Sequence, residues 1–152
     1  MNMNISKAIL DSLELGSLLD KIELQIKNIE IGDTHAEINN LINFPCKSNA
    51  STSNLREEAM KELHEMLYNA FVLICRISLA TSDENLLSFV DKSCSRINAL
   101  LSSSQLKIQK VPKVKPLADL YNKAMLYLQQ NSKGSMSSNI ENLSTTLFIE
   151  IL

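Results

Sequence analysis

The chain has 152 residues, of which 45% are hydrophobic and 21% charged, and its formal net charge is −2. This length and balance are typical of one globular domain with its own core, and they exclude wholesale disorder. The slight acidic excess disfavours a general nucleic-acid binder, because such proteins normally carry a basic excess.

The scarcity of turn-forming residues favours long helices. The chain holds three glycines and three prolines, whereas all-β folds use many glycines in their turns. The first predicted helix covers residues 5–30 and carries an apolar stripe at helical spacing, formed by Ile5, Ile9, Leu13, Ile22, Ile26 and Ile29. A separate short helix, capped by Thr34 with Glu37, is predicted to end at Pro45.

The second long helix is predicted from Asn54 to Ala80, because Asn54 and Glu57 have the spacing of a capping box. Its stripe contains Leu55, Ala59, Leu63, Met66, Ala70, Leu73 and Ile77. Residues 71–75 are apolar all round, which is typical of a helix buried among neighbours or in lipid. A bilayer span needs roughly 20 apolar residues, and Arg76 ends this run too early. We therefore predict the buried end of a central helix and no transmembrane segment.

A third helix is predicted to follow a very short link, so that the two form an antiparallel hairpin. Thr81 with Glu84 is the capping candidate. The spacing then alternates between three and four residues, which predicts a narrow seam against one partner helix, formed by Leu87, Val90, Cys94, Ile97 and Leu101. The same seam would also suit a homodimer.

Two further helices are predicted toward the C-terminus. Pro116 suits a first helical position, and Gly134 is a stop signal. The apolar stripe between them contains Leu117, Leu120, Tyr121, Ala124 and Leu128. Ser138 with Glu141 is predicted to cap a last helix, whose apolar residues are Leu143, Leu147 and Ile151.

These elements predict an all-α fold, a compact bundle of five or six helices in a single domain over residues 1–152. A polar loop at 46–53 and a Lys/Pro connector at 106–116 are the expected breaks. The alternative is an α+β fold with a small sheet, because segments near 22–31, 106–114 and 147–152 also alternate in the manner of strands.

No residue pattern predicts a metal or a cofactor. Neither His35 nor His64 stands in a Glu-x-x-His pattern, the three cysteines lack C-x-x-C spacing, and glycine-rich phosphate loops are absent. Cys46, in the predicted loop, is the one cysteine expected to be accessible. Cys75 and Cys94 fall on apolar faces, where cysteine behaves as a small hydrophobe.

A second source of catalytic groups would be the acidic face of the central helix. Glu58, Glu62 and Glu65 are spaced to share one face, where two carboxylates could share a proton or hold a cation. Such a run is more typical of a solvated helix face, so no catalytic residue is predicted.

The candidate partner-binding residues are all basic: Arg76, Lys107, Lys110, Lys113 and Lys115. Arginine is enriched at interfaces, and Arg76 stands alone in an apolar run. The four lysines form a strip without acidic residues, held extended by two prolines, which suits an acidic partner.

We therefore expect a protein-binding helical module that acts as an adaptor, inhibitor or regulatory subunit without catalysis of its own. The alternatives are a nucleic-acid-binding protein that uses the strip 107–115, or a small enzyme that uses Cys46 or the helix carboxylates. The N-terminal residues resemble no secretory signal. This predicts a cytoplasmic protein, or one delivered without a conventional signal peptide.

Overall fold

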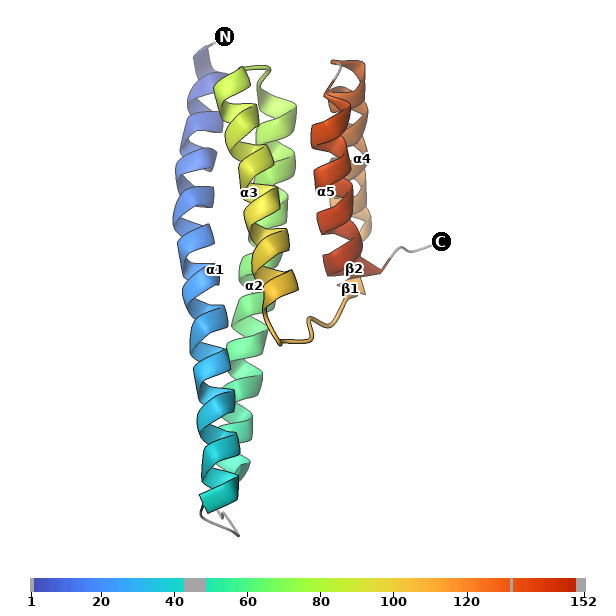
Figure 1. Cartoon of the computed structure of the whole chain (residues 1–152). Helices are drawn as coiled ribbons and strands as arrows, with labels where there is room; N and C mark the ends of the chain where they lie inside the picture. The colour runs from blue at the N-terminus through green and yellow to red at the C-terminus, as the bar shows by residue number, and fades with distance from the viewer. Residues whose placement is uncertain (1, 43–48, 132, 150–152) are drawn as a thin grey trace.

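The computed structural model describes residues 2–42, 49–131 and 133–149, and these ranges form a bundle of five helices (Figure 1). They are α1 (Asn2–Ile42), α2 (Asn49–Ala80), α3 (Glu84–Ser103), α4 (Lys115–Gln130) and α5 (Gly134–Leu147). Successive helices alternate in direction, and the lower parts of α1 and α2 extend as a two-helix arm beyond the other three (Figure 1). The predicted all-α bundle is confirmed.

Helix α2 occupies the centre of the bundle, as its all-round apolar segment predicts. It contacts each of the other four helices. Phe71, Ile74 and Cys75 are fully buried. The ring of Phe71 stacks on Tyr121 of α4 with centroids 5.8 Å apart, and it meets the edge of Phe148 at 5.0 Å.

By length and composition alone, residues Asn54–Ala80 are also apolar enough to cross a membrane. In the bundle, 50% of the most apolar window of this stretch is buried inside the protein. Contact with the surrounding helices accounts for its apolarity, because a central core helix needs the same composition as a spanning one.

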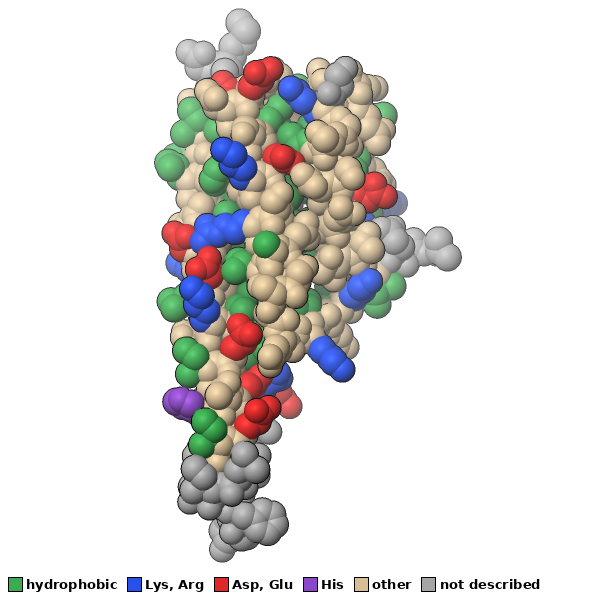
Figure 2. Space-filling model, in the orientation of Figure 1, with side chains coloured by type: hydrophobic (Ala, Val, Ile, Leu, Met, Phe, Trp, Pro, Cys, Tyr) green, Lys and Arg blue, Asp and Glu red, His purple; other side chains and the backbone are tan. Residues whose placement is uncertain are grey.

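Helix α1 runs unbroken to Ile42, so the predicted separate helix at Thr34 is wrong. The Thr34 hydroxyl donates instead to the Glu30 carbonyl at 3.0 Å, a bond that a threonine inside a helix can make. Ile9 and Leu13 are exposed and do not belong to the core stripe. The buried apolar positions described in α1 are Ala8, Leu15, Leu19, Ile22, Ile26 and Ile29. Hydrophobic side chains are visible over α1 at the left edge of Figure 2.

The N-terminus of α2 also differs from the prediction. The helix begins at Asn49, so residues 49–53 are helical and not part of a polar loop, while residues 46–48 lie outside the described ranges. Asn54 and Glu57 consequently lie within the helix instead of capping it. Leu55, predicted on the core stripe, is 68% exposed because it lies on the arm, where the other helices do not reach.

Helix α3 is capped by Asp83 and not by Thr81. The Asp83 carboxylate accepts from the Leu86 amide at 3.0 Å, and the Thr81 hydroxyl accepts from the Asp83 amide at 2.9 Å. The predicted α3 seam is buried along its whole length, from Leu87 to Leu101. Because these residues pack within the monomer, the seam is not available to a second copy.

The last two helices begin earlier than predicted. Lys115 and Pro116 are the first residues of α4. Gly134 opens α5 instead of ending α4, which stops at Gln130, so Ser138 lies inside the last helix. Glycine serves at either kind of helix end, because it lacks a side chain that would restrict its backbone.

The α+β alternative is wrong, although two of its three segments do meet. Residues 22–31 lie in α1, where their apolar side chains also satisfy a helical period. Strands β1 (Val111–Pro112) and β2 (Phe148–Ile149) pair in parallel and contain two residues each. This pairing fastens residues 104–114, which join α3 to α4, to the end of α5. From here on, the connector means residues 104–114.

The stacked position of Phe71 generates a stability prediction. We expect Phe71→Ala to lower the free energy of unfolding by about 3–5 kcal/mol, because it leaves a cavity among α2, α4 and Phe148. Leu55→Ala, on the exposed arm, should change it by less than about 0.5 kcal/mol. Urea denaturation followed by circular dichroism measures both, and equal losses would contradict the central position of α2.

Candidate functional site

A groove lies between α2 and the connector. We call it the α2 groove, and its volume is about 500 Å³. It is lined by Arg56, Glu57, Met60, Lys61 and His64 from α2, and by Lys107, Gln109 and Val111 from the connector. Arg56, Met60 and His64 are four residues apart, so the helical period places them in one row along the groove.

His64 holds the connector against α2. Its Nδ1 lies 2.7 Å from the Met60 carbonyl oxygen, and its Nε2 lies 3.1 Å from the Gln109 carbonyl oxygen. A neutral imidazole carries one N–H and can donate to one of these acceptors. Only the imidazolium donates to both, and in that form His64 also adds a positive charge to the groove.

The remaining charges of the groove are mainly basic. Arg56 donates to both carboxylate oxygens of Asp33 on α1, at 2.7 and 3.2 Å, and this bidentate pair raises the pKa of Arg56. Lys61 and Lys107 are exposed on opposite walls. Glu57 is the acidic residue among the lining side chains described. The groove therefore combines cations with the apolar side chains of Met60 and Val111.

The fold exposes three of the four lysines of the strip and buries the fourth. Lys107, Lys110 and Lys115 are exposed. Lys113 is only 3% exposed, and its Nζ lies 3.9 Å from the centre of the Tyr121 ring, a cation–π contact. The Lys113 amide donates to the Ile149 carbonyl at 3.2 Å, and this bond fixes the connector beside β2.

Arg76 does not reach the α2 groove. It lies twelve residues beyond His64, about 18 Å along the helix at 1.5 Å per residue. Its guanidinium donates to the Asp11 carboxylate of α1 at 3.3 Å. The Arg76 side chain thus joins α1 to α2, and its role in partner binding stays a prediction.

The candidate catalytic groups are not assembled into a site within the described ranges. Burial raises the pKa of Cys75 to about 12, although the nearby Lys113 opposes this shift, and burial also raises the pKa of Cys94. The acidic side chains at 58, 62 and 65 are exposed. No group of three metal-ligating side chains occurs in the part of the chain that the structure describes. Cys46 lies outside the described ranges.

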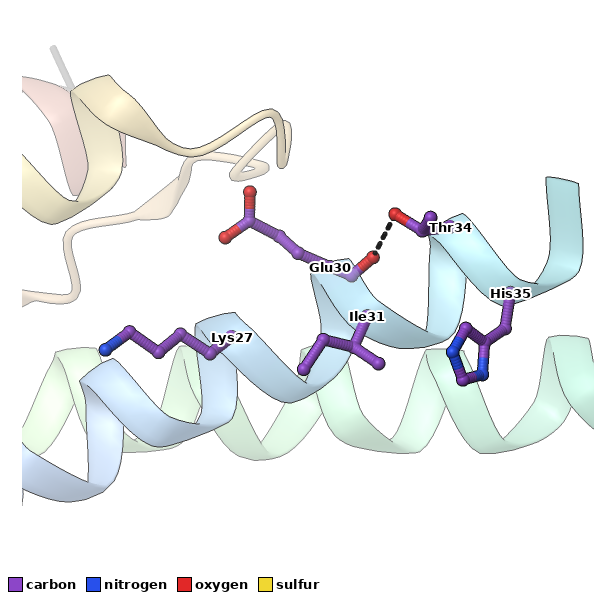
Figure 3. A pocket seen from close by; sticks show the side chains of 5 residues that line it. All are labelled: Lys27, Glu30, Ile31, Thr34 and His35. Carbon is purple, nitrogen blue, oxygen red and sulfur yellow. Dashed lines mark hydrogen bonds between the residues drawn. The ribbon is translucent and has the colours of Figure 1, made fainter. Parts of the chain in front are cut away.

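A second hollow lies on α1, on the arm. Its described lining residues are Lys27, Glu30, Ile31, Thr34 and His35 (Figure 3). In Figure 3, Lys27, Ile31 and His35 follow one another along one side of the helix, and Glu30 points away from that row. Ile31, one of these lining residues, is an exposed apolar side chain.

No protein-family model, no curated protein and no solved structure shows a significant match to this chain. The functional assignment therefore depends on geometry. Of the predicted binding residues, the α2 groove contains Lys107. Sequence reasoning missed Arg56, Lys61 and His64, whose spacing shows that they lie near one another on α2 but not that the connector faces them.

The burial of two thiols generates a reactivity prediction. Because the thiolate is the nucleophile, we expect iodoacetamide at mildly alkaline pH to leave Cys75 and Cys94 unmodified in the folded protein. Both should react after unfolding in guanidinium, which serves as the control. Mass spectrometry of the tryptic peptides resolves each site, and rapid labelling of folded Cys75 would contradict its burial.

Proposed function

We propose that this chain is a protein-binding helical module and that its α2 groove takes an acidic, extended segment of another protein. It would act as an adaptor, inhibitor or regulatory subunit without catalysis of its own. The observation that carries this proposal is the presence of cationic side chains from α2 and from the connector in one groove, together with the apolar side chains of Met60 and Val111.

Charge favours an acidic ligand. Lys61 projects from α2 and Lys107 from the connector, so a carboxylate in the groove meets a cation on either side, while the Arg56 guanidinium is already paired with Asp33. The chain as a whole has a net charge of −2. The local basic surface therefore attracts an acidic segment to the groove, and the acidic remainder of the protein repels it.

Shape favours a short segment over a broad surface. A volume of about 500 Å³ is within the range of ligand pockets and admits a few side chains. Met60 and Val111 offer an apolar contact for one of them, while Lys110, exposed beside the groove, extends the basic surface. The expected ligand is therefore a peptide that carries several acidic residues and one apolar anchor.

The other two functions have less support. Nucleic-acid binding would use the same cations, but the described lining residues include no Phe, Tyr or Trp, the side chains that usually stack on bases. The enzyme alternative would use Cys46, which lies outside the described ranges, or the carboxylates of α2, which are exposed to solvent. The two described cysteines are buried.

The test uses a fluorescently labelled, glutamate-rich peptide with one leucine. We expect Lys61→Glu with Lys107→Glu to weaken its binding by at least about tenfold, or about 1.4 kcal/mol, because both walls then repel the ligand. Lys92→Glu with Lys123→Glu, on exposed positions of α3 and α4, is the matched control with the same change of net charge. Fluorescence anisotropy at several salt concentrations gives the affinities.

Equal weakening in both double variants would show an effect of net charge alone and would overturn the assignment to the groove. Tighter binding of an RNA oligonucleotide than of the peptide would favour the nucleic-acid alternative. Failure of the peptide to bind even at low ionic strength, where charge attraction is strongest, would also overturn the proposal.

A further inference from the structure

Strand β1 is paired with β2 along one of its two edges. Val111 lies opposite Phe148 in this parallel pair, and the Lys113 amide donates to the Ile149 carbonyl at 3.2 Å. In an extended chain the backbone groups of successive residues point to opposite edges. The groups of Val111 and Lys113 therefore face β2, and those of the residues between and before them face the other side.

We call this other side the open edge of β1. It presents the amide and carbonyl of Lys110 and the carbonyl of Pro112. These three groups have no hydrogen-bond partner in the part of the chain that the structure describes, and both residues are exposed. Unpaired backbone groups along a strand are a template to which another extended chain can pair.

The open edge borders the α2 groove. Phe148 of β2 meets the rings of Tyr68 and Phe71, whereas the connector meets His64, which precedes both on α2. The other groove residues of α2 lie between positions 56 and 61. Strand β2, the connector and the groove therefore follow one another along α2 toward its N-terminus, and the arm extends beyond the connector on that side (Figure 1).

The space beside the connector matches the width of one strand. Neighbouring strands lie about 4.8 Å apart, which equals roughly three residues of helix at a rise of about 1.5 Å per residue. A third strand beside the connector would therefore cross α2 at Lys61 and Met60, which precede His64 by three and four positions. Both of these side chains line the groove.

We propose that the acidic segment binds in the α2 groove as an added β-strand, paired with the open edge of β1. This inference rests on the proposed function, because it specifies how the acidic segment is held. The Lys110 amide donates to one carbonyl of the segment, and the carbonyls of Lys110 and Pro112 accept from two of its amides. In strand addition the main-chain bonds provide affinity, and alternate side chains provide specificity.

The pairing determines which side chains the segment needs. Val111 and the buried Phe148 are opposite each other and share the inner face of the sheet. A segment residue opposite Val111 therefore points toward α2 and Met60, which favours an apolar side chain. A residue opposite Lys110 lies on the outer face beside the ammonium group, which favours an acidic one. The expected ligand has an apolar residue with acidic neighbours.

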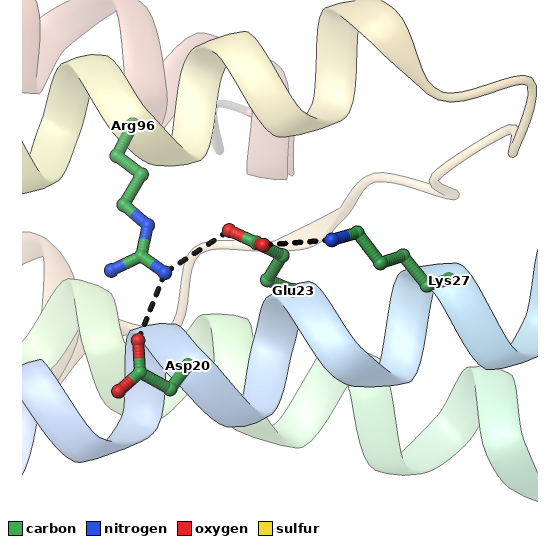
Figure 4. Close-up of polar contacts among 4 residues, drawn as sticks. All are labelled: Asp20, Glu23, Lys27 and Arg96. Atoms are coloured by element: carbon green, nitrogen blue, oxygen red, sulfur yellow. Dashed lines mark hydrogen bonds and ion pairs between the residues drawn. The ribbon is translucent and has the colours of Figure 1, made fainter.

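Charge makes the open edge selective. Lysine and proline on a short edge strand hinder pairing with an arbitrary chain. Lys61, Lys107 and Lys110 form no ion pair with any residue that the structure describes. Arg96 of α3, by contrast, is paired with two carboxylates of α1 at 2.9 and 3.1 Å (Figure 4). The three lysines thus keep their charge available for an acidic strand.

Methylation of the ligand backbone tests the added strand. The probe is the labelled, glutamate-rich peptide with one leucine, made in two versions that carry N-methyl groups on alternate residues. An N-methyl group removes a donor and blocks the approach of a neighbouring strand. Because alternate amides face β1, we expect one version to bind at least about tenfold more weakly than the unmodified peptide and the other within about twofold.

Fluorescence anisotropy gives the three affinities. Equal affinities of the two methylated versions would overturn the added strand, although binding of the unmodified peptide would still support the groove. Failure of the unmodified peptide to bind would overturn the groove and the strand together.

Hydrogen exchange locates the pairing on the protein. We expect a saturating amount of peptide to slow exchange of the Lys110 amide at least about tenfold, because this amide gains an acceptor. The Lys113 amide is the control, since its bond to Ile149 is present without the peptide, and its rate should change much less. NMR spectroscopy of the ¹⁵N-labelled full chain resolves both amides. An unchanged Lys110 rate with the peptide bound would overturn the strand.

Discussion

The fold depends on one constraint, that residues 71–75 of α2 are apolar on every side and must be covered on every side. Helix α1 covers one side of α2, α3 packs beside both, and α4 and α5 cover the remainder. The stacking of Phe71 on Tyr121 and its edge contact with Phe148 connect α2 to the C-terminal hairpin. Among the described residues, α2 contributes more buried side chains to the common core than any other helix, and helical stability in proteins comes mainly from packing of apolar faces.

Helices α3 and α4 both pack on α2, so the connector between them passes beside α2. The α2 groove lies between this connector and α2. The connector is attached along its length, first by Gln109 to His64 and then by Lys113 to Ile149 and Tyr121. Because its backbone is fastened, the lysines on its outer side are held in place. A fixed basic surface loses less conformational entropy on binding than a free lysine-rich linker would.

The sequence by itself determined the helical class, the central place of α2 and the buried seam of α3, because an apolar period shows which side chains share a face. Helix ends were less certain, since rival caps such as Thr81 and Asp83 differ by no more than about 1 kcal/mol. Only the tertiary structure decided which way Leu13 faces, that Lys113 turns inward and that Lys107 stands opposite Lys61. The physical reason is that periodicity is a property of one element, whereas a groove is formed by two elements that meet far apart in the chain.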